Sequence, residues 1–244
     1  RMSGCTLVPI PTPDGKLTPD LLRPQLHGFG ECHHPQPGAV YISQASELGT
    51  VYRPEEIRAL AELLHGHGMY LHVDGARLAN ACAYLNCSMK ELTVDCGVDI
   101  LSFGGTKNGM MMGEAVISFR PEISAHLPYI RKQSAQLASK ARYLAAQYVP
   151  YLDGLWLENA RHANAMAAKL VKLLKGFPAV HFTQEPQTNQ LFFTLPAEAA
   201  ARLMEKYFFY YWDEAAGEVR LVTSWDTTEE DLAHLEASLH ELLD

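Results

Sequence analysis

The 244-residue sequence contains no apolar run approaching ~20 residues, the length that a helix needs to cross a bilayer. Its first stretch, RMSGCTLVPIP, lacks the long apolar core of a secretory signal peptide. We therefore expect neither membrane spanning nor export. Long basic runs are also missing: the longest is Arg131-Lys132, and 20 basic residues against 28 acidic ones give a net charge of −8. Nucleic acids and anionic membranes attract basic clusters, so neither is expected as a partner.

Cysteine is scarce as well. There are five, an odd number, and no two stand in a CxxC spacing. This pattern fits a reducing compartment, so we expect the cytoplasm. The adjacent pair His33-His34 lies in a loop rich in Gly, Pro and His, and no Asp, Cys or His partner follows at ligand spacing. A solvated loop is favoured there over a metal site.

What the sequence does contain is enough apolar residues, 48%, for a sizeable core. Strand-like and helix-like segments alternate in the first half, which is typical of a parallel sheet covered by helices. The chain opens directly on a strand-like segment, as if it began within a domain. The expected strands are 5–10, 39–43, 69–73 and 100–103, and the expected helices are 19–26, 54–65, 76–85 and 88–94.

The second half is different in pattern. Helices are expected over 134–148 and 155–174, because apolar residues recur at three- and four-residue spacing. Strands over 180–183, 190–195, 209–212 and 218–223, with helices over 197–206 and 229–243, indicate a small α+β domain. With a boundary at Pro150 to Gly154, residues 1–152 are predicted to belong to a large α/β domain and 153–244 to the small one.

One lysine, Lys107, stands between glycines in the stretch DILSFGGTKNGMMMGEAVISF, residues 99–119. The turn lies between two apolar runs that we expect to be buried strands. Glycine lets a planar group approach without meeting a Cβ, and apolar flanks are expected to desolvate the ammonium and favour the free amine. A lysine that forms a Schiff base needs this environment. A solvated lysine in a Gly-rich hairpin is the alternative, and the three methionines are expected to serve packing.

An aspartate, Asp74, falls at the carboxyl end of a predicted strand in MYLHVDGARLANA, residues 69–81. Open α/β sheets bind ligands at that edge. Such a carboxylate can accompany the protonated ring nitrogen of pyridoxal phosphate (PLP). The alternative is a helix N-cap without chemistry.

Taken together, the sequence resembles the threonine aldolase family of PLP-dependent lyases, in the fold group of aspartate aminotransferase. Seven blocks carry this resemblance, in family order: ISQASELGTVY (42–52), LHVDGARLANA (71–81), SFGGTKNGMMMGEAVISF (102–119), RKQSAQLASKARYLAAQY (131–148), LENARHANAMAAKL (157–170), TNQLFFTLP (188–196) and VRLVTSWDTTEED (219–231). Family members carry roughly a further third of chain before these blocks. The resemblance implies the α/β fold of type I PLP enzymes, with a parallel-rich sheet flanked by helices and a small α+β C-terminal domain.

The resemblance also implies roles for single residues. Lys107 would bind PLP covalently, Asp74 would face its ring nitrogen, and Arg77 its phenolic oxygen. Lys132 matches a basic position near the cofactor phosphate or its entry path, although a surface lysine would look the same. Arg220, in an otherwise apolar strand, would bind the substrate carboxylate; without the resemblance, an outward-facing arginine is favoured. Glu47 could lie near the site or simply be solvated.

The implied reaction is cleavage of a β-hydroxy-α-amino acid, such as L-threonine or L-allo-threonine, to glycine and an aldehyde. The implied assembly is a homodimer or homotetramer whose sites lie between subunits. The sequence does not identify the catalytic base or a phosphate-binding loop. Two alternatives stay open: another lyase or transferase of the same PLP fold, and a truncated, cofactor-free relative that acts as an interaction module.

Overall fold

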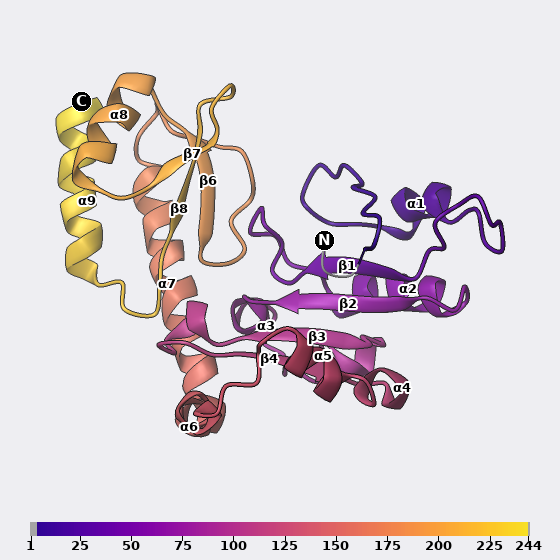
Figure 1. Ribbon diagram of the computed structural model, residues 1–244. Helices are drawn as coiled ribbons and strands as arrows, with labels where there is room; N and C mark the ends of the chain where they lie inside the picture. The colour runs from indigo at the N-terminus through magenta and orange to yellow at the C-terminus, as the bar shows by residue number, and fades with distance from the viewer. Residues whose placement is uncertain (1–3, 244) are drawn as a thin grey trace.

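The computed structural model describes residues 4–243 and contains two four-stranded sheets (Figure 1). The first half of the chain forms sheet A, in the order β1-β2-β3-β4. The first three strands are parallel, and β4 runs antiparallel to β3. These strands are β1 (Ala39–Ser43), β2 (Tyr70–Gly75), β3 (Ile100–Gly104) and β4 (Glu114–Ser118).

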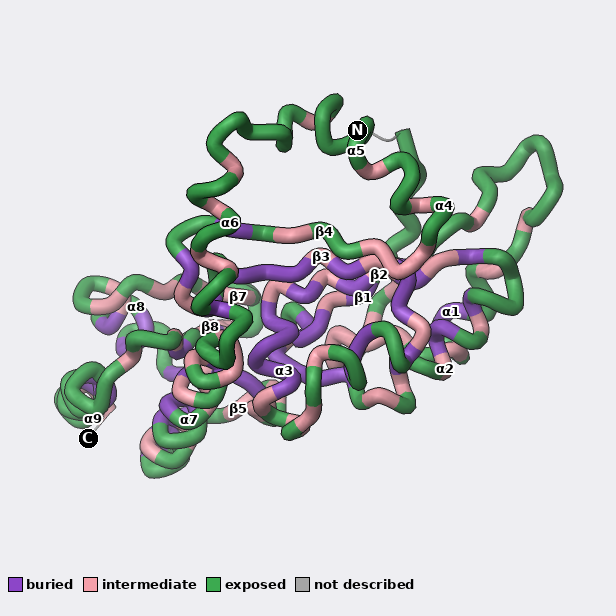
Figure 2. The backbone as a smooth tube through the Cα atoms, turned by 90° about the horizontal axis from the view of Figure 1, so that it is seen from below, coloured by how far each residue is buried: buried purple, intermediate pink, exposed green. Residues whose placement is uncertain are grey.

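The two faces of sheet A differ. Side chains alternate between faces along each strand, and one set is buried against α2 (Pro54–His65) and α3 (Leu78–Leu85): Val40, Ile42, Leu71, Val73, Leu101 and Phe103. The intervening residues are partly or largely exposed: Tyr41, Ser43, His72, Asp74 and Ser102. Figure 2 shows many buried residues in sheet A and on α3. The polar face of sheet A is thus available for function.

Sheet B, from the second half, has the order β5-β6-β8-β7 and is entirely antiparallel. Three helices pack with it around a second apolar core. The elements are α7 (Trp156–Leu174), β5 (His181–Phe182), β6 (Gln190–Thr194), α8 (Ala197–Lys206), β7 (Tyr210–Asp213), β8 (Glu218–Val222) and α9 (Glu229–Leu243).

The elements that remain are short. A helix near the start is capped by the Thr18 hydroxyl, which accepts from the Leu21 N–H at 3.3 Å. Three more helices follow β4 before the kink at Tyr151–Leu155, where Gly154 has φ +100°. These helices are α1 (Pro19–Leu22), α4 (Pro121–Ser124), α5 (Leu127–Gln133) and α6 (Ala141–Pro150).

The predicted fold class is confirmed: an α/β sheet rich in parallel strands precedes an antiparallel sheet with helices. The division into domains at residues 152 and 153 stays a prediction, and its outer limits, Arg1 and Asp244, lie outside the described residues. Of the helices in residues 4–243, none is long and apolar enough to cross a membrane.

Three predicted elements are wrong. Residues 5–10 form no strand, since no described strand pairs with them, and Leu7 is 88% exposed. Residues 88–94 begin with a Ser88–Glu91 cap but form only turns and a short 3₁₀ helix, Val94–Cys96. The helix expected over 134–148 is interrupted, because Ala135 has φ +57° after the end of α5 and helical structure resumes only at Ala141.

Candidate functional site

Asp74 lies near the carboxyl end of β2, and two donors from different segments fix its carboxylate. Its Oδ1 accepts from the Ala76 N–H at 2.9 Å, and its Oδ2 accepts from the Tyr41 hydroxyl on β1 at 2.6 Å. The helix-cap alternative is wrong, because α3 begins only at Leu78 and Asp74 bonds within the preceding turn. A carboxylate accepts about four hydrogen bonds. Asp74 therefore keeps acceptor capacity for a ligand.

Arg77 follows directly and is a buried cation, 9% exposed. Its nearest ion-pair partner is the Glu47 carboxylate, at 4.0 Å. Within residues 4–243, no group accepts a hydrogen bond from its guanidinium by ordinary geometry. Burial lowers the pKa of Arg77, while Glu47 raises it, Arg220 lowers it and Asp74 raises it. Glu47, Asp74 and Arg220 therefore lie close enough to affect the charge of Arg77. Arg77 itself keeps N–H donors that no described residue uses.

The turn that carries Lys107 lies against the Asp74 turn. A Cβ on Gly104, the last residue of β3, would come within 2.7 Å of the Ala76 Cα. Only glycine permits this close approach. The next residues form a 3₁₀ turn, Thr106–Asn108, and the Thr106 hydroxyl accepts from the Gly113 N–H at 3.0 Å. The prediction that Lys107 lies where the chain reverses between two strands is confirmed. The first of these strands, β3, pairs with the strand of Asp74, as expected.

The predicted desolvation of Lys107 is wrong. Its side chain is exposed. The reason is that β4 lies at the edge of sheet A and presents Val116 and Ile117 to solvent, 60% and 36% exposed, so this flank is not buried. Of the methionines expected to serve packing, Met110 is buried, whereas Met111 and Met112 are 92% and 62% exposed.

Asn108, next to Lys107, anchors the turn to the following helix. Its buried amide nitrogen donates to the Tyr151 hydroxyl at 2.9 Å and to the Trp156 carbonyl at 2.7 Å. The Asn159 side chain, on α7, donates in turn to the Asn108 carbonyl at 2.9 Å. The side chain and the carbonyl of Asn108 thereby both hold the backbone beside Lys107 in place. The amine of Lys107 nevertheless extends into solvent.

Arg220 lies on β8, half-buried, opposite Phe192 and Tyr210. Its guanidinium donates to the Tyr210 hydroxyl and lies 4.7 Å from the ring centre of Trp212. This cation–π contact helps to hold the guanidinium in place. Within the described chain, no carboxylate pairs with it, so donors remain for an incoming anion.

The structure does not bring Lys132 into this group. It lies near the end of α5, exposed, and no described residue forms a hydrogen bond or ion pair with its side chain. Its predicted role near the phosphate stays a prediction. His33 and His34 lie in the expected loop, and no group of three or more potential metal ligands is found in residues 4–243.

Sequence reasoning missed the aromatic members of the site: Tyr41, Tyr210 and Trp212. For Tyr41, the sequence of β1 held a signal, because the alternation in AVYIS places Tyr41 and Ser43 on the same face of the sheet. Ser43 pairs with Asp74 on the neighbouring parallel strand, so Tyr41 lies on the face of Asp74. For Tyr210 and Trp212 there was no such signal. Their proximity to Arg220 depends on the pairing of β7 with β8.

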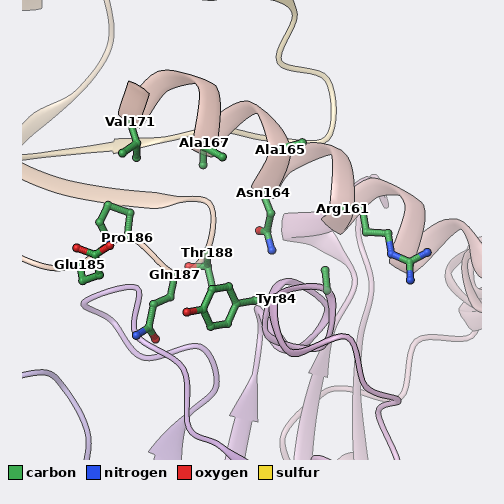
Figure 3. Close-up of a pocket in the computed structure, with 12 residues that line it drawn as sticks. Tyr84, Arg161, Asn164, Ala165, Ala167, Val171, Glu185, Pro186, Gln187 and Thr188 are labelled. Carbon is green, nitrogen blue, oxygen red and sulfur yellow. The ribbon is translucent and has the colours of Figure 1, made fainter. Parts of the chain in front are cut away.

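A cavity lies elsewhere, between the two halves of the chain. It has a volume of about 440 Å³ and lies between α3, α7 and the segment 185–188. Figure 3 shows the Tyr84 ring directed towards Thr188, with Arg161 turned away from them. None of the predicted site residues lines it. The candidate site is therefore the polar face of sheet A at its junction with sheet B, and not this cavity.

Comparisons with known proteins identify the family of this chain. A family model described as beta-eliminating lyase matches residues 1–198. The chain is 39% identical over 242 residues to a low specificity L-threonine aldolase from a Pseudomonas species, covering 99% of this chain and 70% of the relative. It is 41% identical over 234 residues to a low specificity L-threonine aldolase of Pseudomonas aeruginosa, covering 96% and 68%.

A solved structure of a threonine aldolase is also similar to this chain. The threonine aldolase of Leishmania major is similar with a TM-score of 0.91 and 31% identity, and the match covers 100% of this chain and 72% of that one. The family model covers well over half of the chain, and the similarity extends beyond it to the second sheet. On this evidence, the chain belongs to the beta-eliminating lyase family.

Proposed function

We propose that this protein is a PLP-dependent lyase that cleaves L-threonine or L-allo-threonine to glycine and acetaldehyde. The observation that carries the proposal is the meeting of three features at one edge: a lysine turn, a fixed carboxylate and a buried arginine with unused donors. The two Pseudomonas relatives, both named L-threonine aldolases, support the substrate class.

The residues present fit PLP. An aldehyde requires an amine, which Lys107 presents on an accessible turn. A protonated ring nitrogen requires an anion, and Asp74 has acceptor sites left. An anionic ring oxygen requires donors, and the buried guanidinium of Arg77 has them. Lys107, Asp74 and Arg77 would therefore hold the cofactor, with Lys132 as a further proposed contact near its phosphate.

When bound, PLP supplies an electron sink for the bond that breaks at Cα. Asp74 would hold negative charge beside the ring nitrogen, which keeps a proton on that nitrogen. Arg220 would bind the substrate carboxylate through two parallel N–H donors, and this contact sets which bond at Cα stands perpendicular to the ring. Lys107 Nζ, as a free amine, would accept or return a proton at the substrate Cα.

A product assay tests the proposal. The purified chain, saturated with PLP, is expected to convert L-threonine and L-allo-threonine to equal amounts of glycine and acetaldehyde. Borohydride reduction followed by peptide mass spectrometry should find the cofactor on Lys107, with the Lys132 peptide as internal control. A product other than an aldehyde would favour another PLP lyase or transferase. Absence of any cofactor on the protein would favour a non-catalytic interaction module.

Two finer expectations remain proposals. A homodimer or homotetramer is proposed on the resemblance to the family and on the exposed apolar side chains around β4, α5 and α6, such as Val116, Tyr129 and Val149. Light scattering at several protein concentrations tests it, and a monomer that binds PLP tightly would contradict it. The cytoplasmic location likewise stays a prediction.

A further inference from the structure

Tyr41 reaches Asp74 through its hydroxyl group, and no role was predicted for it from the sequence. Its hydroxyl donates to Asp74 Oδ2 at 2.6 Å, the shorter of the two hydrogen bonds that this carboxylate accepts from residues 4–243. The other donor, the Ala76 N–H, belongs to the same turn as Asp74. Tyr41 is therefore the donor that reaches Asp74 from a different strand.

We propose that Tyr41 is a positioning residue, which orients the Asp74 carboxylate towards the ring nitrogen of the cofactor. This inference rests on the proposed PLP-dependent function. A carboxylate held at one oxygen can rotate about its Cβ–Cγ bond, whereas one held at both oxygens from different directions has a fixed plane. Each oxygen then keeps a free acceptor position in a defined direction, which is what a single N–H donor on a flat ring requires.

The surroundings of Tyr41 support a built contact. Its ring lies edge-on to His72, with ring centres 5.2 Å apart and planes at 80°. His72 is itself held by the Ser102 hydroxyl, at 2.9 Å, so the row crosses β1, β2 and β3. Burial and the hydrogen bond to Asp74 raise the pKa of Tyr41 to about 12, so the phenol stays protonated and donates at neutral pH.

Tyr41 is 55% exposed. Water can therefore replace part of what the hydroxyl supplies, and the effect of removing it should be moderate. A Tyr41→Phe variant keeps the ring and its contact with His72 and loses only the donor. Tyr70→Phe is the matched control, since Tyr70 also lies in sheet A and its hydroxyl donates to a carboxylate, Glu122, at 3.3 Å, but at the opposite end of β2.

The test compares two ligands on the apo form of the full chain: PLP and a carbocyclic analogue that has C–H in place of the ring nitrogen. We expect Tyr41→Phe to weaken PLP binding roughly fivefold and to leave the analogue unchanged, because the analogue makes no hydrogen bond to Asp74. Tyr70→Phe should change neither affinity. The absorbance of bound PLP should also shift in Tyr41→Phe alone.

Equal losses for both ligands in Tyr41→Phe would overturn the proposal and make Tyr41 a general structural residue, and unchanged binding of PLP would overturn it too. In both cases the wild-type chain still binds PLP, so the proposed function stands. Failure of the wild-type chain to bind PLP would instead overturn the function and the role of Tyr41 together. Circular dichroism melts of the variants check that both fold.

Discussion

Two aspartates of sheet A, Asp99 and Asp74, invite comparison because they lie at opposite ends of neighbouring strands. Asp99, just before β3, is fully buried. Its carboxylate accepts from the Leu71 N–H at 2.6 Å, contacts His65 Nε2 at 3.0 Å and pairs with Arg120. Side chains from α2 and from the residue just before α4 thus converge on one carboxylate, which joins these helices to the sheet.

Asp74 has fewer partners and more exposure. Two donors reach it, and Arg77 beside it has no acceptor among the described residues. A carboxylate whose acceptor sites are filled by the protein stabilises the fold, whereas one with sites left beside an unfilled cation can bind a ligand. The end of sheet A at Asp99 is therefore expected to stabilise the fold, and the end at Asp74 to bind the ligand. Substitutions at the two ends can test this division.

The largest effect is expected for Lys107, which shares the Asp74 end. Lys107→Ala should lower turnover by at least ~10³-fold, because the amine that binds the cofactor and carries protons is lost. Steady-state assays and the absorbance of bound PLP measure it. Lys172→Ala, at an exposed lysine of α7 outside the site, is the control and should change turnover little. Near-normal turnover in Lys107→Ala would show that the reaction does not take place at the Asp74 end of sheet A.

Asp74→Asn should retain PLP but lower kcat roughly 10²-fold, because a neutral amide no longer favours the proton on the ring nitrogen. Its urea denaturation curve should stay close to that of the wild type, since Asp74 is partly exposed. Assays with saturating PLP measure the first effect. Wild-type activity in this variant would reduce Asp74 to a turn-forming residue.

Asp99→Asn should show the opposite behaviour. Breaking a buried charged network by removing one partner costs about 3 kcal/mol of unfolding free energy, so the denaturation midpoint should fall. Turnover per folded molecule should stay within about twofold of wild type. If turnover falls while the midpoint is unchanged, the division between a structural and a chemical end of sheet A is wrong.

A smaller effect than for these three variants is expected for Arg220→Lys. The ammonium keeps the charge but loses the two parallel donors and the stacking on Trp212, so KM for threonine should rise about tenfold with little change in PLP affinity. Arg161→Lys, an exposed arginine outside the site, is the control. An unchanged KM would leave Arg220 as a structural partner of Tyr210.

The sequence predicted elements well where local signals were complete. The helix 54–65 was predicted with its true bounds, because Pro54, Glu55 and Glu56 mark its start and Gly66 follows its end. The segment 5–10 has the composition of a strand, but composition cannot supply a pairing partner. For the helix expected over 134–148, apolar spacing gave no sign that Ala135 adopts a left-handed conformation.

The sequence predicted where Lys107 and Asp74 lie, in turns after neighbouring strands, and their chemical roles stay a prediction. What could not be predicted is how residues from distant strands orient them. The contact between Tyr41 and Asp74 joins residues 33 positions apart, and Tyr210 meets Arg220 only through the register of sheet B. The exposure of Lys107 was missed for the same reason, because the edge position of β4 is a property of the whole sheet.

The hydrogen bond from Asn159 to the turn of Lys107 fixes the rotation of α7 about its own axis. Asn159 lies in its first turn, and Ala167, Leu170 and Leu174, further along, face the core of sheet B. Each residue advances an α-helix by 100°. One residue inserted between these points would turn the sheet B face of α7 away from its core, whereas seven would restore its direction almost completely and lengthen it by about 10 Å. Natural length variation in this helix should therefore come in steps of whole turns.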